Sequence, residues 1–297
     1  MDKKVLALLL LVAALSSVSG CSKPEVKKVT MHWGTVNSSV TQIISNVTVT
    51  DPLPFSIPLS GVNVKIYMNG IEMGTGHSVG RASIFPPESN IKLVIDLINS
   101  RLVDWWVTHI RNGERTTVKI VSDLEFSIFG LKFGVPVTRV SEFRTNFLSI
   151  PPAKSVGIYV AGLKVGEVKD VKLRWGDVTH GSTQVIATAT VVNDLPVPLY
   201  LNYLEYNIYM NGIKMGSGRI ASTKIIKPKS QERVEFTMYI DNSKIPEWWV
   251  THIRNGERTT VKVEMGVGMT IRGKSVFVPL NSYTYTIQTH ILQSPVG

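Results

Sequence analysis

Two kinds of hydrophobic pattern follow each other along the chain. Residues 43–50 and 184–192 alternate between apolar and polar positions, the two-residue period of a half-buried β-strand. Residues 62–74 form two β-rich runs around Asn69-Gly70, which favours a tight hairpin because both central residues of a type I′ turn need positive φ angles. Asn211-Gly212 repeats this signal. These patterns predict antiparallel strands joined by short turns.

A helical period interrupts each group of predicted strands. Large, mostly apolar side chains recur at i, i+3, i+4, i+7 and i+8, which puts them on one face of a helix. They are Leu102, Trp105, Trp106, His109 and Ile110, and then Ile245, Trp248, Trp249, His252 and Ile253. We expect Ser100 and Ser243 to cap the helices, because a serine hydroxyl can accept a bond from a free first-turn amide. Gly113 and Gly256 stand where a left-handed residue commonly ends a helix.

The chain contains one sequence unit twice. The fifteen residues WWVTHIRNGERTTVK occupy positions 105–119 and recur unchanged at 248–262. All six tryptophans form equivalent pairs, since Trp33 matches Trp175. The matched stretches cover about residues 26–148 and 168–291. The distance between equivalent residues is too long for a solenoid repeat. We therefore predict an all-β protein of two tandem β-sandwiches, each with one short α-helix.

The first residues indicate export. Lys3 and Lys4 precede an apolar run over residues 5–15, and small residues then lead to Cys21. This order is typical of a secretory signal, and it resembles a prokaryotic lipobox, in which cleavage leaves a lipid-bearing cysteine as the new N-terminus. The alternative is an accidental cysteine behind an ordinary signal or an uncleaved anchor. We predict lipid attachment at Cys21 and a place on the outer face of the cell membrane.

Domain boundaries follow from the leader and the repeat. We assign residues 1–20 to a lipoprotein-type signal peptide, 21–150 to the first sandwich and 151–297 to the second. A proline pair and three glycines indicate a connector between the matched stretches: Pro151-Pro152, Gly157, Gly162 and Gly166.

Composition narrows the class of protein. Hydrophobic residues make up 43% of the 297 positions and charged residues 18%, which excludes a wholly disordered chain. Lys and Arg number 32 against 22 Asp and Glu, and the net charge of +10 favours anionic partners such as lipids or acidic polymers. One cysteine excludes an internal disulfide framework and a zinc site with several thiolates. An exported protein is not expected to bind nucleic acid.

Candidate chemistry is sparse. The stretch 76–80, GHSVG, fits the G-x-S-x-G pattern of a hydrolase nucleophile, yet it follows a hairpin arm, and the second copy lacks the serine position. The six histidines form no short-spaced cluster of the kind that binds metal. We predict no enzymatic activity, no cofactor and no metal. His109 and His252 are expected to be half-buried beside tryptophan, with pH sensing as the alternative.

The paired tryptophans have two interpretations. Each indole can bury on the order of 150–250 Å², so one pair could close the end of a sandwich core. Alternatively, the pairs form a surface platform with nearby basic residues. The residues of this candidate binding face are Trp105, Trp106, Arg111, Arg115, Lys119, Trp248, Trp249, Arg254, Arg258 and Lys262. The unchanged run fits a shared binding face, and recent duplication or gene conversion would produce the same identity.

Two sequons offer candidate glycosylation sites on an exported chain. They begin at Asn37 and Asn46. Asn46 lies within a predicted strand, so Asn37 is the better candidate.

The order of the motifs resembles the WHy (water stress and hypersensitive response) domain of group 2 late embryogenesis abundant proteins. A strand ends at Asp51-Pro52, or at Asp194-Leu195-Pro196 in the second copy. A Tyr-x-Asn-Gly hairpin, Gly-x-Gly, a helix and a strand begun by glycine follow. Archaeal and bacterial lipoproteins carry this domain singly or in tandem, so the chain resembles a tandem WHy-domain lipoprotein of archaeal type.

The resemblance implies a fold and a role. The fold would be a seven-stranded immunoglobulin-like or fibronectin-III-like sandwich with one helix, and no catalytic residues are carried over. The role would be tolerance to desiccation, heat or cold. We therefore predict a non-enzymatic, membrane-tethered protein that protects client proteins or membranes. The alternative is a cell-surface receptor or adhesion module that binds an envelope polymer or anionic lipid.

Overall fold

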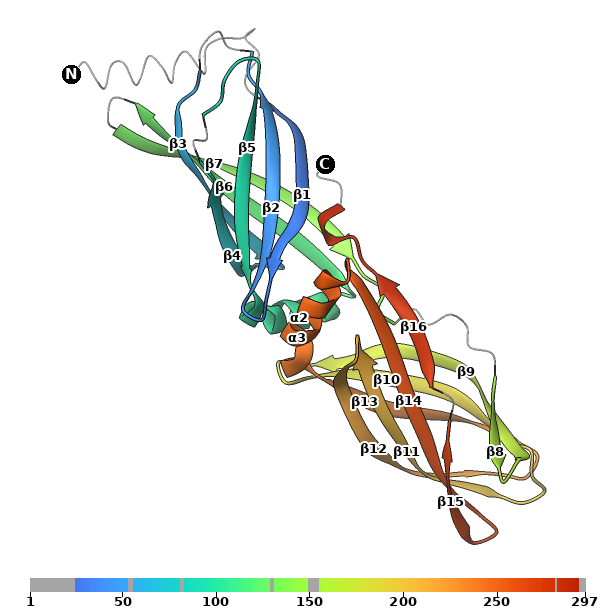
Figure 1. Cartoon of the computed structure of the whole chain (residues 1–297). Helices are drawn as coiled ribbons and strands as arrows, with labels where there is room; N and C mark the ends of the chain where they lie inside the picture. The colour runs from blue at the N-terminus through green and yellow to red at the C-terminus, as the bar shows by residue number, and fades with distance from the viewer. Residues whose placement is uncertain are drawn as a thin grey trace.

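The chain forms two β-units that lie end to end, with two α-helices between them (Figure 1). The computed structural model describes residues 25–52, 56–80, 83–128, 131–148, 155–280 and 282–293. We call residues 25–148 the first unit and residues 155–293 the second unit. The predicted signal peptide and Cys21 lie outside the described residues, as do Pro151-Pro152 and the predicted boundary at 150.

The first unit is a single curled antiparallel sheet. Its seven strands are ordered β1-β2-β5-β4-β3-β6-β7. The strands are β1 (Glu25–Val36), β2 (Val40–Thr50), β3 (Leu59–Met68), β4 (Ile71–Ser78), β5 (Glu88–Ile98), β6 (Arg115–Ile128) and β7 (Leu131–Arg144). A 3₁₀ turn, η1 (Asn99–Arg101), leads from β5 into helix α2 (Leu102–Arg111).

The second unit has a similar strand order with one additional strand at its start, and its strands are divided between two sheets. One sheet, ordered β13-β10-β9-β8, contains β8 (Val156–Val160), β9 (Leu163–Val178), β10 (Ser182–Asn193) and β13 (Gln231–Asp241). The other contains β11 (Leu199–Met210), β12 (Ile213–Ile226), β14 (Arg258–Ile271), β15 (Lys274–Pro279) and β16 (Tyr283–Gln288), with β15 and β16 both paired to β14. The remaining elements are η2 (Asn242–Lys244), α3 (Ile245–Arg254) and η3 (Ile291–Gln293). The predicted class, all-β sandwich-like units with one short α-helix each, is confirmed.

The predicted turns have the expected backbone conformation. Asn69 and Gly70 have φ angles of 49° and 84°, and Asn211 and Gly212 have 52° and 81°, as a type I′ hairpin requires. The helices also end as predicted, since Gly113 and Gly256 have φ angles of 66° and 69°.

The predicted helix caps are wrong. Ser100 and Ser243 lie inside η1 and η2, because each chain completes a 3₁₀ turn before its α-helix begins. At the entrance to η2, the Asp241 carboxylate accepts a bond from the backbone N–H of Ser243 at 2.9 Å. The serine backbone is therefore the donor, and aspartate supplies the cap.

The predicted connector is too long on its C-terminal side. Residues 156–166 form the hairpin of β8 and β9, which turns at Ala161-Gly162 with φ angles of 49° and 79°. Gly162 thus marks a tight turn and not a linker. Gly166 stands where the backbone of β10 comes close, since a Cβ built there would lie 2.1 Å from the Val192 carbonyl oxygen.

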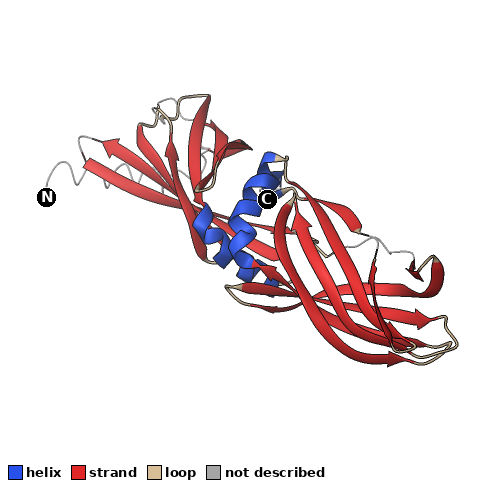
Figure 2. Ribbon diagram, turned by 60° about the horizontal axis from the view of Figure 1, so that its bottom comes forward, coloured by secondary structure: helices blue, strands red, loops and turns tan. Residues whose placement is uncertain are grey.

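The larger hydrophobic core runs through both units. It includes Ile95 and Trp106 of the first unit together with Ile208 and Trp248 of the second. A second core, around Leu199, fills the far end of the second unit. Helices α2 and α3 pack against each other in the shared core, and Figure 2 shows them as a pair between the two sets of strands. We call this contact region between the units the junction.

Candidate functional site

Four helical tryptophans lie at the centre of the junction. Trp105, Trp106, Trp248 and Trp249 are between 0% and 1% exposed. The Trp105 and Trp249 ring centroids are 5.3 Å apart, and those of Trp106 and Trp248 are 5.7 Å apart. The surface-platform interpretation is therefore wrong for all four indoles. The helical stripe of each unit covers the end of its own sandwich and also packs on the stripe of the other unit.

One tryptophan of each pair forms a hydrogen bond to the opposite unit. Trp106 Nε1 donates to Thr183 Oγ1 at 2.9 Å, and Trp249 Nε1 donates to Thr41 Oγ1 at 3.0 Å. Each threonine hydroxyl then donates to the side chain of an asparagine in its own unit, Asn99 or Asn242. Both threonines are 0% exposed. A buried indole N–H without an acceptor would cost about 1–3 kcal/mol, so these bonds fix how the two units face each other.

Glu114 of the first unit ties three segments together. Its Oε1 accepts the indole N–H of Trp175, from the opposite unit, at 2.9 Å. Its Oε2 accepts the Thr145 hydroxyl at 2.8 Å and the backbone N–H of Phe147 at 2.6 Å. Glu114 is 7% exposed and has a φ angle of 60°, a conformation that costs a non-glycine residue of order 1–3 kcal/mol. The contacts made by its carboxylate hold it there.

Glu257 has the same role in the second unit. It accepts the indole N–H of Trp33 at 3.0 Å, the Thr289 hydroxyl at 3.1 Å and the backbone N–H of Ile291 at 2.6 Å. Its φ angle is also 60°. Neither Glu114 nor Glu257 was predicted to be a functional residue from the sequence. Both lie within the unchanged fifteen-residue run, which was the available signal.

A buried histidine completes a polar chain in each unit. His109 Nδ1 lies 2.7 Å from Thr116 Oγ1, and its Nε2 lies 2.8 Å from Thr145 Oγ1. Because the Thr145 hydroxyl donates to Glu114, its oxygen accepts a hydrogen bond from the Nε2–H group of the neutral ring. Thr116 accepts the Trp105 indole N–H at 2.9 Å and is free to donate to Nδ1. The hydroxyl groups of Thr116 and Thr145 therefore each accept one hydrogen bond and donate another.

His252 occupies the equivalent chain with Thr259 and Thr289. Both histidines are more buried than the half-buried state that we expected, at 0% and 1% exposure. Burial lowers the pKa of His109 and of His252 from 6.5 to about 4. The neutral form is thus the one that fits the junction.

The basic residues of the predicted binding face do not form one surface. Arg111 donates through Nε and Nη2 to the Val178 carbonyl oxygen at 3.2 and 2.5 Å, and Arg254 donates in the same way to the Val36 carbonyl oxygen at 3.1 and 2.5 Å. Both arginines therefore bind the opposite unit. The other four side chains are exposed, Arg115 and Lys119 on β6 and Arg258 and Lys262 on β14. Within their own units, Arg115 pairs with Glu142 and Lys262 pairs with Glu264. Arg258 donates to the Gln288 side chain.

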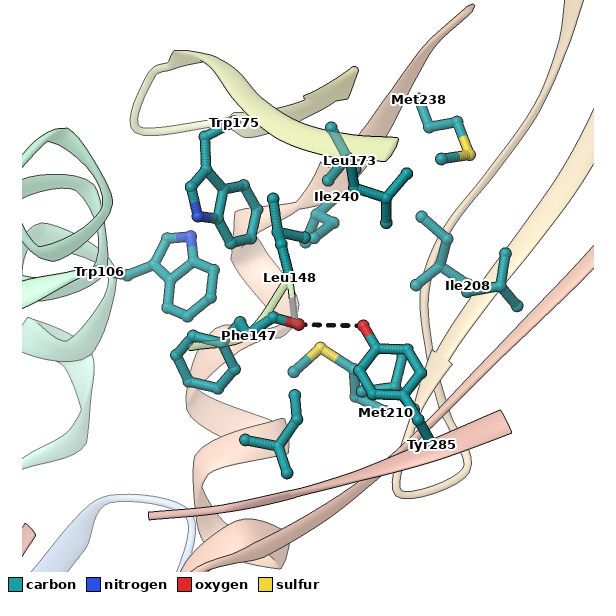
Figure 3. A pocket seen from close by; sticks show the side chains of 14 residues that line it. Trp106, Phe147, Leu148, Leu173, Trp175, Ile208, Met210, Met238, Ile240 and Tyr285 are labelled. Carbon is teal, nitrogen blue, oxygen red and sulfur yellow. Dashed lines mark hydrogen bonds between the residues drawn. The ribbon is translucent and has the colours of Figure 1, made fainter. Parts of the chain in front are cut away.

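Each unit extends a short segment into the open end of the opposite unit, next to the helices. Figure 3 shows Phe147 and Leu148 of the first unit facing a small cavity inside the second unit, where the Tyr285 hydroxyl donates to the Phe147 carbonyl oxygen at 3.0 Å. Ile291 and Leu292 line the corresponding cavity of the first unit. The cavities measure about 40 and 70 Å³ and are almost entirely apolar. This space is small beside ordinary ligand pockets of roughly 300–1,000 Å³.

The remaining predicted sites lie outside the tryptophan cluster, although Asn37 stands next to Val36, which accepts from Arg254 at the junction. Asn37 and Asn46 are both exposed, and the Asn37 side-chain oxygen accepts the backbone N–H groups of Ser39 and Val40 at 2.9 Å. Ser78 ends strand β4 and accepts the backbone N–H of Val62 at 3.1 Å. Over the described ranges, no group of three or more histidine, cysteine or acidic residues is placed to hold a metal. Within the same ranges, no helix is long and apolar enough to span a membrane.

Comparison with solved structures finds partial matches. A crystal structure of a protein from Archaeoglobus fulgidus is 35% identical, with 41% of this chain and 98% of that chain covered and a TM-score of 0.39. For a solution structure of an Arabidopsis thaliana protein, identity is 16%, the coverages are 50% and 89%, and the TM-score is 0.34. For β-glucuronidase 2 of Bacteroides uniformis, identity is 12%, the coverages are 83% and 26%, and the TM-score is 0.26.

A family comparison gives one assignment. No curated protein matches the sequence. The family model described as late embryogenesis abundant protein matches residues 188–283, which run from β10 to the start of β16 and include α3. The second unit of this chain therefore contains a domain of the late embryogenesis abundant type.

Proposed function

We propose that this chain is a non-enzymatic protein, held on the outer face of the cell membrane by lipid on Cys21, that protects client proteins or membranes during desiccation, heat or cold. The observation that carries the proposal is the late embryogenesis abundant match over residues 188–283. That match supports a stress-related role without catalysis. The export signal and the lipid anchor rest on residues 1–21 of the sequence.

The polar groups of the junction hold the two units together, which supports a role without catalysis. His109, Glu114 and their copies are bonded to partners inside the protein, and these partners account for the way the side chains point. Such a network joins the two units into one elongated body. A client or a membrane would then meet the folded outer faces of the β-sheets.

The course of β1 is compatible with an anchor at the N-terminal side. Strand β1 begins at Glu25, at the end of the first unit that is remote from the helices, and its last residue, Val36, meets Arg254 at the junction (Figure 1). The four residues from Cys21 to Glu25 span at most about 14 Å. An anchored chain would therefore keep the first unit at the membrane and hold the second unit away from it.

The proposal is tested in a deletion strain that is complemented with the wild-type gene or with Cys21→Ser. Wild type is expected to restore survival after drying, freezing and heat shock, and mass spectrometry is expected to find a lipid-modified N-terminal cysteine in the membrane fraction. Cys21→Ser is expected to move the protein out of that fraction and to restore survival less well. Unchanged survival of the deletion strain under all three stresses would exclude the protective role.

The alternative function is that of a receptor or adhesion module. The four helical indoles cannot form its binding surface, because they are buried. Its remaining basis is the net charge of +10 and the exposed basic side chains on β6 and β14. Binding of this kind must weaken as ionic strength rises. Pull-down with anionic vesicles at low and high salt separates the alternatives, since a lack of salt-sensitive binding excludes the charged face.

A further inference from the structure

The polar contacts across the junction have a two-fold pattern. Three kinds of contact occur twice, with the roles of the two units reversed. The indole–threonine contacts are Trp106 with Thr183 and Trp249 with Thr41, the indole–carboxylate contacts are Trp175 with Glu114 and Trp33 with Glu257, and the guanidinium–carbonyl contacts are Arg111 with Val178 and Arg254 with Val36.

Each unit by itself carries both halves of every one of these contacts. The first unit holds the donor Trp106 and also Thr41, the acceptor that the copy of Trp106 uses. It likewise holds the donor Trp33 and the acceptor Glu114. A surface on which donor and acceptor patches are both present and related by a two-fold axis is self-complementary, as in an isologous dimer.

The short segments that each unit extends into the opposite unit have the same two-fold relationship. Leu148 in the first unit has its counterpart in Leu292, and Phe147 has its counterpart in Ile291, so an apolar side chain enters the open end of the opposite unit in both directions. The backbone N–H groups of Phe147 and Ile291 are held by equivalent glutamates at the same 2.6 Å distance. A first unit placed against another first unit would offer the same residue type at each of the indole–threonine, indole–carboxylate and guanidinium–carbonyl contacts.

We propose that the junction is a homotypic docking surface whose partner outside the chain is a second copy of this chain. In the resulting pair, the first unit of one copy docks on the first unit of the other, and the second units dock in the same way. This arrangement closes on itself, because both junction surfaces of both chains are covered. The intramolecular junction competes at an effective concentration in the millimolar range, so the pair forms where chains are crowded.

One contact at the edge of the junction differs between the two halves and provides a probe. Asp104 Oδ1 lies 3.3 Å from His180 Nδ1, and both side chains are partly exposed. The residues at the equivalent positions in the sequence are Glu247 and Ser38. In a pair of first units, Asp104 of one chain would face Ser38 of the other. Within one chain, Asp104 faces His180.

The experiment uses full-length chains in a Cys21→Ser background, which removes the natural thiol. One chain carries Asp104→Cys and the other carries Ser38→Cys. The two are mixed in equal amounts at about millimolar concentration, oxidised and separated without reductant. A disulfide between positions 38 and 104 then necessarily joins two chains. The matched control replaces Ser38→Cys by Ser60→Cys, an exposed position on β3 at the remote end of the first unit.

We expect at least tenfold more covalent dimer from the 38 and 104 mixture than from the control, with the 38–104 disulfide found by peptide mass spectrometry. A second chain, with Asp104→Cys and His180→Cys together, is expected to form an internal disulfide and to remain a monomer. Dimer at the control level from the 38 and 104 mixture overturns the proposal. That result is decisive when the internal disulfide of the second chain forms, because thiols at this edge are then shown to be close enough to be joined across the junction.

Discussion

The indole N–H of Trp106 donates to the hydroxyl of Thr183, a residue 77 positions later in the chain and in the other unit. Its counterpart is the bond from Trp249 to Thr41. The two bonds are made by the second tryptophan of each unchanged fifteen-residue run. Each copy of the run therefore supplies the equivalent indole donor for one half of the same junction.

Removing the acceptor at position 183 should loosen the junction. Thr183→Val keeps the side-chain volume nearly constant but leaves the Trp106 N–H and the Asn242 side-chain oxygen without their partner. We expect a loss of about 1–3 kcal/mol in the free energy of unfolding, measured by urea denaturation. Thr190→Val, at a partly exposed position on the same strand, is the control. A loss no larger than that of the control would show that the bond does not hold the units.

Neutralising one junction carboxylate should cost more than neutralising an exposed one. In Glu114→Gln, a side-chain NH₂ group replaces one acceptor oxygen and faces the N–H and O–H donors that Glu114 now accepts. Hydrogen bonds to charged groups contribute about 1.5–3 kcal/mol each, so we expect a loss of at least that size in urea denaturation. Glu142→Gln breaks an exposed ion pair with Arg115 and should cost much less, because water and salt screen exposed charges. Equal losses for the two variants would contradict the role of Glu114.

Acid should destabilise the protein through its two buried histidines. Burial lowers the pKa of His109 and His252 from 6.5 to about 4, so the unfolded chain binds more protons than the folded chain between these values. The contribution of these histidines to the free energy of unfolding is therefore highest above pH 6.5, falls as the pH is lowered through this window and is lost below pH 4. The loss is of the order of 3 kcal/mol per histidine, because each pH unit corresponds to about 1.4 kcal/mol per proton.

The matched variants for this pH dependence are His252→Gln and His290→Gln. The first removes one of the two buried titrating groups and should reduce the histidine contribution to the slope by about half between pH 6.5 and 4. The second changes an exposed histidine and should keep the wild-type slope. Urea denaturation at several pH values measures the slopes. Identical slopes for His252→Gln and wild type would assign the acid sensitivity to other groups.

The local elements could be predicted from the sequence, because their causes lie within a few residues. Asn69-Gly70 specifies a turn, and the spacing of Trp105 and Trp106 specifies a buried helix face. The junction could not be predicted in this way. A helical stripe shows that a face is buried but not which surface covers it, and Thr183 is an ordinary threonine in an alternating strand until Trp106 is placed beside it. The role of Glu114 likewise depends on its contact with Trp175, 61 residues away.

A double-mutant cycle can test the crosswise pairing directly. Trp106→Phe removes the indole N–H and keeps an aromatic ring, while Thr183→Val removes its acceptor. Since the two side chains share one hydrogen bond, their effects on the free energy of unfolding should be non-additive by about 0.5–3 kcal/mol. Thr41→Val is the internal control, because Thr41 belongs to the same unit as Trp106 but accepts from Trp249. The cycle of Trp106→Phe with Thr41→Val should therefore show a smaller coupling in dilute solution, where pairing between chains is disfavoured. A coupling between positions 106 and 41 that exceeded the coupling between positions 106 and 183 in dilute solution would contradict the assignment of the Trp106 bond to Thr183.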